Sequence, residues 1–515
     1  MSHRIAARRP RPAAAPPIER DPSIVSSFLS DAAHVPGGHA SGVAFPRTEA
    51  EVAAMVRDAD RVLPIGAQSS LTGGATPRGD IVLSTRTLTS IAQPEGDRVR
   101  VGAGVSLAVL QRTLAAAGLF YPPVPTFDGA CVGGVVSTNA AGAATFKYGS
   151  TRKWVRGIVV VLANGDVLDL QRGDVTTSSD GSFEIVHPSG GVTGVKAPTY
   201  TMPSVPKLSA GYFAQPGMDL VDLFVGSEGT LGVIVEATLG VIARPRRALA
   251  LIRCDDDRQA LALAGALRDE AADAWHGRGP LDVAAIEYMD GRALRAVPDE
   301  AFARAQVTRP SSGSVMLMVQ IEVAANEESA FERLDDVVKA AGVVDDPVFA
   351  SPGDDRAAQR LFELREAVPA SVNAIVAAAK ARSHPDIEKT AGDPVVPFAR
   401  LGEALSLYRA AFERRGLDYA IWGHVSDGNL HTNLIPATMD DVHRGREAIV
   451  DVASVAIGMG GAPLAEHGVG RSALKQRLLR DLYGDEGIEQ MRAVKRALDP
   501  TWKLSPGVLF PADVR

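Results

Sequence analysis

Three glycine-rich segments lie in the first half of the chain, among short runs of β-forming residues. They read P-I-G-A-Q-S-S-L-T-G-G (64–74), C-V-G-G-V-V-S-T-N-A-A-G (131–142) and F-V-G-S-E-G-T-L-G-V-I (224–234). Glycine permits positive φ and brings backbone N–H groups close to a ligand, and a concave row of N–H groups suits a pyrophosphate. For the first segment alone, a glycine-rich surface turn is an equal alternative. The other two do not match a Rossmann or P-loop sequence, so neither of those sites is expected.

The sequence around these segments predicts an α+β lobe. Strands are expected at Ile81–Ser84, Gly157–Leu162 and Val233–Val241, and helices at Glu49–Asp58 and Leu107–Ala117. The two helices are predicted because their apolar residues recur at helical spacing. The stretch from Gly173 to Gly211 is rich in Ser, Gly, Pro and Thr and has weak periodicity. It predicts a long excursion over the surface, with a substrate lid as one interpretation.

Near Pro245 the character of the sequence changes, which indicates a second lobe. Strands are predicted at Ala248–Cys254, Leu281–Tyr288 and Val315–Val323, and helices at Arg258–Ala274, Glu327–Ala341, Asp440–Met459 and Asp485–Leu498. Two strand–helix–strand units in this order predict an antiparallel sheet with helices on one face. Tyr419–Pro436 is strand-like with a turn, and Asp499-Pro500 ends the last helix.

Composition narrows the classes of protein and partner. The chain has 515 residues, enough for roughly two to four domains. Its formal net charge of −7 disfavours nucleic acid as a main partner, because phosphate binding needs a basic face. Cys131 and Cys254 are the two cysteines and form no C-x-x-C pair. This argues against an iron–sulfur cluster or a cysteine zinc site.

The N-terminal residues 1–20 are basic and rich in proline and alanine, and we expect a disordered tail. They lack the apolar core of a secretory signal. No stretch of the sequence approaches about 20 uninterrupted apolar residues, so no membrane span is expected. We therefore predict a cytoplasmic location and leave a peripheral contact with a membrane open.

A cluster of histidine and acidic residues lies late in the chain. It reads G-H-V-S-D-G-N-L-H (423–431), followed by A-E-H-G-V-G (465–470). Neutral imidazole and carboxylate are suitable ligands for Zn²⁺ or another first-row ion. Strict strand alternation would place His424 and His431 on opposite faces, but the D-G-N turn signal could bring both to one site. The alternative is that both are hydrogen-bonded structural residues.

In their order, spacing and residue identities, these segments resemble those of the vanillyl-alcohol oxidase / p-cresol methylhydroxylase superfamily. The resemblance covers roughly residues 40–512. Within this superfamily, the chain is similar to the branch of D-lactate dehydrogenase, D-2-hydroxyglutarate dehydrogenase and the glycolate oxidase flavin subunit. The resemblance implies an α+β fold with a two-part FAD-binding domain of the p-cresol methylhydroxylase type and an antiparallel-sheet α+β substrate (cap) domain. The expected divisions are a tail (1–20), the FAD-binding domain (36–245), the cap with a metal site (246–475) and a helical segment returning to the FAD domain (476–515).

The resemblance also assigns the cofactor contacts. The first segment would hold the pyrophosphate, the second the phosphates and the isoalloxazine, and the third the adenosine end. The residues implied are Pro64, Gly66, Gln68, Ser69, Ser70 and Gly73; Thr126, Gly133, Gly134, Thr138, Asn139 and Gly142; and Glu228, Gly229, Gly232 and Ile234. Some relatives carry a covalent flavin on a His of the first segment. That segment has no His here, so noncovalent FAD is expected.

By the same resemblance, His424, His431 and Glu466 are expected to bind a divalent metal, with Zn or Mn as the expected ion. His467 would be the general base, and Asn429 a neighbour of the substrate or flavin. Asp427 is interpreted as orienting a ligand imidazole.

Two cationic residues resemble the family's contacts to the substrate carboxylate. Arg365 resembles the carboxylate-binding arginine, and Lys389 a second polar contact. Without the resemblance, an ion pair of Arg365 on a helix surface would be preferred. Relatives often have Asn at Ser505, Lys at Val508 and a hydroxyl residue at Pro369, and these departures leave the substrate side chain undetermined.

The resulting hypothesis is oxidation of a small D-2-hydroxy acid of the D-lactate, D-2-hydroxyglutarate or glycolate type. Hydride would pass to flavin N5 with help from the metal. The electron acceptor is unidentified, and a homodimer is left open. Two alternatives remain: a non-redox FAD transferase like the ether-lipid synthase, and a non-catalytic flavoprotein that carries electrons.

Overall fold

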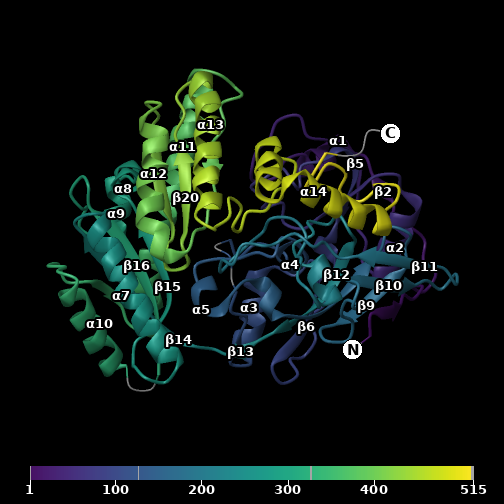
Figure 1. Cartoon of the computed structure of the whole chain (residues 1–515), viewed down its shortest axis with the longest axis horizontal. Coiled ribbons are helices and arrows are strands. Elements are labelled where there is room, and N and C mark those ends of the chain that lie inside the picture. The colour runs from purple at the N-terminus through teal and green to yellow at the C-terminus, as the bar shows by residue number, and fades with distance from the viewer. Residues whose placement is uncertain (1, 124, 126, 325–326, 512–515) are drawn as a thin grey trace.

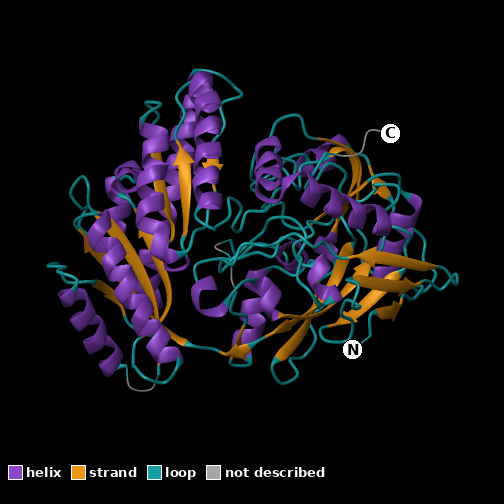
Figure 2. Cartoon of the chain, in the orientation of Figure 1, coloured by secondary structure: helices purple, strands orange, loops and turns teal. Residues whose placement is uncertain are grey.

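The computed structural model describes residues 2–123, 125, 127–324 and 327–511. They form two lobes (Figure 1). The first lobe comprises the chain up to Ala243 together with the C-terminal segment from Ala473, and the second lobe runs from Arg246 to Ser472. Helices and strands are mixed in both lobes (Figure 2), which confirms the predicted α+β class. None of the described helices is long and apolar enough to cross a bilayer.

The first lobe is built on small sheets. A four-stranded sheet has the order β2 (Ile18–Glu19), β3 (His39–Ala44), β5 (Arg78–Ser84) and β4 (Val62–Ile65). A second has the order β6 (Arg98–Gly102), β12 (Val233–Gly240), β8 (Val155–Val161) and β9 (Val167–Gln171), and β13 (Ile242–Ala243) pairs with β7 (Leu119–Phe120). Strands β3, β5 and β4 are parallel, whereas the second sheet is antiparallel. The predicted strands therefore correspond to β5, β8 and β12.

Six α-helices are described in this lobe before Ala243. They are α1 (Pro22–Val25), α2 (Glu49–Asp58), α3 (Leu107–Ala116), α4 (Val132–Ser137), α5 (Thr145–Tyr148) and α6 (Leu220–Phe224). Four of the six, namely α1, α2, α3 and α6, begin at a side-chain cap. The Thr48 hydroxyl accepts a hydrogen bond from Glu51 N at the start of α2, and Ser106 accepts one from Val109 N at the start of α3. Such caps satisfy backbone N–H groups that the helix leaves unpaired. Both predicted helices are confirmed.

The prediction of a disordered tail at residues 1–20 is wrong for residues 2–20, which the structure describes. Strand β1 (Arg4–Ala6) pairs in parallel with β10 (Ser182–Val186), which pairs with β11 (Val192–Lys196). Ala7 is buried, and Arg8 forms an ion pair with Glu49 at 2.6 Å. Composition alone did not reveal this pairing, because the partner strand lies far away in the sequence.

One antiparallel sheet forms the centre of the second lobe. Its order is β17 (Val348–Ala350), β14 (Arg246–Cys254), β16 (Val315–Val323), β15 (Asp282–Met289), β19 (Tyr419–His424), β20 (Asn429–Leu434) and β18 (Ala391–Gly392). The predicted antiparallel sheet is confirmed. The expectation of helices on one face is wrong. Ala250 and Ile252 of β14 pack with α7 (Asp257–Trp275) and α12 (Leu401–Glu413). Leu249 and Leu251, on the other face, pack with α9 (Asp299–Ala305) and α11 (Asp355–Arg382).

The helices on these two faces account for most of the remaining chain. They are α7 (Asp257–Trp275), α8 (Gly291–Ala296), α9 (Asp299–Ala305), α10 (Glu328–Ala340), α11 (Asp355–Arg382), α12 (Leu401–Glu413) and α13 (Met439–Gly458). Helix α14 (Ala473–Leu498) follows them in the first lobe. The predicted helix Asp485–Leu498 is the second half of α14, after a non-helical Gly484. Helix α11 continues through Pro369 and carries Arg365. Helix α14 packs against α13 and β11, so it joins the two lobes.

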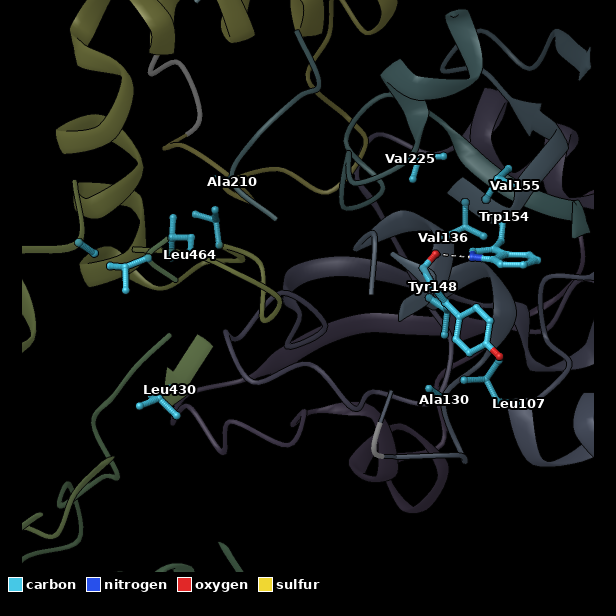
Figure 3. Packing of buried hydrophobic residues seen from close by; sticks show 14 of the residues in the cluster. Leu107, Ala130, Val136, Tyr148, Trp154, Val155, Ala210, Val225, Leu430 and Leu464 are labelled. Atoms are coloured by element: carbon cyan, nitrogen blue, oxygen red, sulfur yellow. Dashed lines mark hydrogen bonds between the residues drawn. The ribbon is translucent and has the colours of Figure 1, made fainter. Parts of the chain in front are cut away.

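One of the apolar clusters extends across both lobes. Figure 3 shows Leu430 and Leu464 of the second lobe and Val136 and Tyr148 of the first among its members. Trp154 Nε1 donates a hydrogen bond to the Tyr148 carbonyl at 2.9 Å. Because burial of apolar surface drives packing, the lobes are held together by the same effect that folds each of them.

A buried carboxylate at the seam adds polar contacts between the lobes. Glu322 of β16 accepts hydrogen bonds from Lys147 Nζ at 2.6 Å and from the Tyr148 hydroxyl, both in the first lobe. Arg247 approaches its other oxygen at 3.1 Å. Lys147 also reaches Asp282 at 2.5 Å.

Replacing Glu322 with Gln should destabilise the protein by about 1–3 kcal/mol, because the network loses its buried negative charge and one of its two acceptor oxygens becomes an NH₂ donor. The thermal unfolding midpoint measures the effect. Glu327→Gln is the control, since its ion pair with Arg246 is exposed and exposed pairs add little stability. Equal midpoints for the two variants would contradict a stabilising role for the Glu322 network.

Candidate active site

A cavity of about 1460 Å³ lies between the lobes. All three glycine-rich segments line it on one side. Of the predicted cofactor residues, those that line it are Pro64, Gly66, Gln68, Ser69, Ser70, Gly73, Gly133, Gly134, Thr138, Glu228, Gly229, Gly232 and Ile234. Thr126 lies outside the described residues. The other wall includes Arg365, Lys389, His431, Glu466 and His467.

Asn139 and Gly142 do not line the cavity, unlike the other predicted cofactor residues that the structure describes. Asn139 Nδ2 donates to the Leu208 carbonyl at 3.2 Å, and its Oδ1 accepts from Arg152 N at 2.9 Å. Gly142 N donates to the Thr145 hydroxyl at 3.1 Å. Both residues therefore hold loops in place around the cavity.

The polar groups of Gln68 and Glu228 are also used within the protein. Gln68 Nε2 donates to the Phe28 carbonyl at 3.0 Å. The Glu228 carboxylate accepts hydrogen bonds from Val469 N and Gly470 N, each at 2.8 Å. Burial raises the pKa of Glu228 to about 7. Glu228 thus ties the third glycine-rich segment to the turn that carries Glu466 and His467.

The second segment leaves room for a flat ligand. A Cβ atom added to Gly134 would meet no atom within 4 Å, although Gly134 lines the cavity. A Cβ on the neighbouring Gly133 would lie 2.8 Å from Ala103 Cβ. Gly133 is therefore required for packing, whereas Gly134 keeps the cavity wall bare. A bare glycine-rich wall fits the cofactor that the sequence predicts.

The two histidines predicted as metal ligands, His424 and His431, are brought together by a hairpin. Strands β19 and β20 are joined by a 3₁₀ turn at Val425–Asp427, and Trp422 pairs with His431. Opposite residues, and residues two apart, share one face of a hairpin, so His424 and His431 point the same way. Their ring centroids are 5.3 Å apart. The prediction that the turn brings both imidazoles to one site is confirmed.

Glu466 and His467 reach this hairpin from the turn before α14. Asp393 Oδ2 accepts hydrogen bonds from Glu466 N at 2.8 Å and His467 N at 2.9 Å. Gly470 has φ of +57°, and a Cβ there would lie 2.1 Å from the Thr72 hydroxyl. Only glycine fits this approach of the turn to the first glycine-rich segment.

Three imidazoles converge on one carboxylate oxygen. Glu466 Oε1 lies 3.1 Å from His431 Nε2, 3.4 Å from His424 Nε2 and 3.7 Å from His467 Nε2. Asp393, His431, Glu466 and His467 offer ligand atoms that all lie within 4.8 Å of one another, and His424 lies outside that group of four. This mixture of imidazole and carboxylate donors suits a first-row divalent ion.

Two buried carboxylates that the sequence analysis did not select orient the imidazoles. Glu287 faces His424 Nδ1, and Asp393 lies 3.3 Å from His431 Nδ1 and 3.4 Å from His467 Nδ1. Burial opposes ionisation of Asp393, but His467 and His431 hold the pKa of its carboxyl well below its usual range. Glu287 is the lone charged residue inside the apolar run of β15, and a buried charge in such a strand is a signal for a partner.

Asp427 and Asn429 lie behind the ligands. Asp427 Oδ2 lies 3.1 Å from Lys207 Nζ, so its carboxylate faces an ammonium and not a ligand imidazole. Asn429 is fully buried and does not line the cavity. Its Nδ2 donates to Asp393 Oδ1 at 3.0 Å, which links the hairpin to the carboxylate that holds the Glu466 turn.

The predicted carboxylate anchors differ in their contacts. Arg365 Nη2 lies 2.7 Å from Glu287 Oε2, and Arg365 Nη1 lies 2.8 Å from Glu366 Oε1. Lys389 has no ion pair or hydrogen bond within the part of the chain that the structure describes. Its Nζ lies 5.1 Å from the centre of the Trp422 ring. Burial lowers the pKa of Lys389 to about 8, so it presents a positive charge to the cavity at neutral pH.

His467 and His424 have opposite charge preferences. Burial lowers the pKa of His467 to about 4, so its imidazole is neutral at neutral pH and can accept a proton. Burial opposes charge on His424 too, but Glu287 and Glu466 raise its pKa to about 9.

Comparison with known proteins identifies two family domains in the chain. Residues 251–509 match the family described as FAD linked oxidases, C-terminal domain, and residues 40–171 match an FAD binding domain. The glycolate oxidase subunit GlcD of Bacillus subtilis is 27% identical over 88% of this chain and 84% of its own length. The D-2-hydroxyglutarate dehydrogenase of Stutzerimonas stutzeri is 28% identical over 92% of this chain and 91% of its own.

A solved structure shows the same fold. p-Cresol methylhydroxylase with substrate bound superposes with a TM-score of 0.66 at 15% identity, and the match covers 96% of this chain and 94% of that one. This likeness confirms the predicted fold type.

The two adjacent glycines of α4 provide a matched test of the cavity wall. Gly134→Ala should fold as well as the unaltered protein and bind FAD at least about tenfold more weakly, because its methyl group enters the cavity. Gly133→Ala should lower the thermal midpoint, since its methyl group meets Ala103. Flavin absorbance per protein and unfolding midpoints measure both. Unchanged FAD affinity in Gly134→Ala would place the flavin elsewhere.

Proposed function

The chain belongs to the FAD-linked oxidases, and from this we propose that it oxidises a small D-2-hydroxy acid to the 2-oxo acid with the help of a divalent metal. The observation that carries the proposal is the convergence of three imidazoles on Glu466 Oε1. His431, Glu466 and His467 line the cavity opposite the glycine-rich segments, whereas His424 is buried and does not line it. The names of the relatives, a glycolate oxidase subunit and a D-2-hydroxyglutarate dehydrogenase, support this class of substrate.

The FAD is proposed to be noncovalent, because residues 64–74 contain no histidine. When bound, FAD supplies the acceptor for the hydride that leaves Cα of the substrate. Gly134 and its neighbours in the glycine-rich wall leave space for the ring. Backbone N–H groups of the first segment are suited to the pyrophosphate.

The metal ligands are proposed to be His424, His431 and Glu466, with Zn or Mn as the ion. When bound, the metal supplies a Lewis acid that lowers the pKa of the substrate hydroxyl. Asp393 also lies within ligand distance, but its Oδ2 already accepts from Glu466 N and His467 N. We therefore assign Asp393 to orienting the ligand imidazoles, as carboxylates commonly do around metal sites.

His467 is proposed as the base that takes the hydroxyl proton. It lines the cavity and is neutral at neutral pH because burial lowers its pKa to about 4. Asp393 lies 3.4 Å from its Nδ1, which favours the tautomer with the proton on Nδ1. Nε2 is then the basic nitrogen, and it faces the same side as Glu466.

Lys389 and Arg365 are proposed to hold the substrate carboxylate. The Lys389 ammonium lines the cavity and has no hydrogen-bond or ion-pair partner among the described residues. Arg365 pairs with buried Glu287 and with Glu366, whose side chain is 49% exposed. A substrate carboxylate could replace the exposed Glu366 on Arg365 Nη1, because exposed ion pairs are weak.

Anaerobic titration tests this function directly. Flavin absorbance would be followed during addition of D-lactate, L-lactate, D-2-hydroxyglutarate, glycolate and D-malate in turn. Bleaching by a D-acid and not by its mirror image is the expected result. A preparation that holds FAD and is bleached by none of them would exclude the proposed reaction within this set of acids.

His467→Ala should lower turnover by about 10²–10⁴-fold, the usual contribution of a general base. FAD content should stay unchanged, since the imidazole contacts none of the glycine-rich segments in the described structure. Steady-state turnover and flavin absorbance are the measurements. His443→Ala, on the exposed face of α13, is the control. Undiminished turnover in His467→Ala would remove this residue from the mechanism.

Lys389 predicts the pH dependence of substrate binding. Its pKa is lowered to about 8, so the ammonium is charged below that pH and is lost as the pH rises through it. The KM for the hydroxy acid should therefore increase above pH 8, and KM measured from pH 6 to 10 checks this. Lys389→Met should raise KM and flatten this rise. The same rise in Lys389→Met would assign the effect to another group.

A further inference from the structure

Lys207 lies at the seam between the lobes and is completely buried, with 0% of its side chain exposed. Its Nζ is 3.1 Å from Glu466 Oε2 and 3.1 Å from Asp427 Oδ2. Lys207 belongs to the first lobe, whereas both carboxylates belong to the second. A charged group from one lobe therefore contacts a residue at the proposed metal site of the other.

The backbone around Lys207 is fixed from both sides. The Leu208 carbonyl accepts from Asn139 Nδ2 at 3.2 Å, and Ser209 N donates to the Leu464 carbonyl at 3.2 Å. Leu208 also packs near Ala465. This end of the Gly173–Gly211 stretch is buried, so the interpretation of the stretch as a lid is wrong here. The backbone next to Lys207 is therefore hydrogen-bonded to both lobes.

The contact with Lys207 gives the two carboxylate oxygens of Glu466 different partners. Oε2 accepts a hydrogen bond from Lys207, while Oε1 faces His431 and His424. The ammonium competes with a metal for Oε2, because both need its lone pairs. Only Oε1 is then available as a ligand atom. The Asp427 carboxylate neutralises the charge of Lys207. Lys207 can therefore occupy Glu466 Oε2 without adding net positive charge to the site.

We propose that Lys207 is a positioning residue that restricts Glu466 to binding a metal through one oxygen and so selects a small first-row ion over Ca²⁺. Ca²⁺ takes about 6–8 oxygen ligands and often binds both oxygens of a carboxylate. Zn²⁺ is satisfied by about four ligands, including imidazole nitrogen. This inference rests on the metal site of the proposed function.

The test is metal affinity, which does not depend on turnover. Flavin-loaded protein would be stripped of metal, and its dissociation constants for Mn²⁺, Zn²⁺ and Ca²⁺ measured by competition with a chelator. In Lys207→Met, the preference for Mn²⁺ over Ca²⁺ should fall by about tenfold, since neighbours of ligands commonly alter affinity by this amount.

A double variant separates position from charge. Lys207→Met with Asp427→Asn keeps the net charge of the site but still frees Glu466 Oε2, so the altered preference should persist. Because the double variant removes both charges of the Lys207–Asp427 pair, neither partner is left as an unpaired buried charge, and the protein is expected to fold. Recovery of the original preference would show that charge alone sets it and would overturn the positioning role.

Lys495→Met is the matched control, because Lys495 is also a buried lysine but pairs with Asp499 and backbone carbonyls away from the cavity. Its metal preference should match that of the unaltered protein.

An unchanged preference in both Lys207 variants would overturn the inference alone. Failure of the unaltered protein to bind any of the three ions would instead overturn the proposed metal site, and the inference with it.

Discussion

The carboxylate of Asp393 is the contact on which the geometry of the site depends. Its Oδ2 accepts from the backbone of Glu466 and His467, while its Oδ1 accepts from Asn429 and lies beside His431. One buried group therefore fixes the turn and the hairpin relative to each other. Burying the Asp393 carboxylate without these donors would cost free energy. The buried carboxylate is therefore stable only when both the turn and the hairpin are in place.

The site belongs to neither lobe alone. The glycine-rich wall is in the first lobe and the imidazoles are in the second, and three contacts join them at close range. Glu228 accepts from the backbone of the Glu466 turn, Gly470 packs against Thr72, and Lys207 reaches Glu466. A shift between the lobes would change the distance from flavin to substrate, and small misplacements of reacting groups reduce rates strongly.

Local signals in the sequence were enough to predict the longer strands β5, β8, β12, β14, β15 and β16, the β19–β20 hairpin, and the helices α2, α3, α7, α10, α13 and the second half of α14. The residues of the cavity wall came from the family resemblance. The D-G-N turn located the histidine pair because a tight hairpin is set by neighbouring residues. Glu287, Asp393 and Lys207 were missed because they meet their partners only in the tertiary structure. The same reason explains the pairing of β1 with β10 and the second layer of helices on the cap sheet. Asn139 was predicted to contact the cofactor because it lies in a glycine-rich segment. It does not line the cavity, and its side chain instead forms hydrogen bonds with the backbone of Leu208 and Arg152.

Metal-assisted oxidation by bound FAD is the central claim, and one anaerobic experiment addresses both parts. The protein, with FAD bound, would be mixed rapidly with the D-2-hydroxy acid that bleaches it, before and after chelation and after restoring Mn²⁺ or Zn²⁺. We predict that bleaching is fast before chelation, that it is lost on chelation while FAD is retained, and that it returns when the metal is restored. Bleaching at the same rate without metal would contradict a catalytic role for the ion at His424, His431 and Glu466.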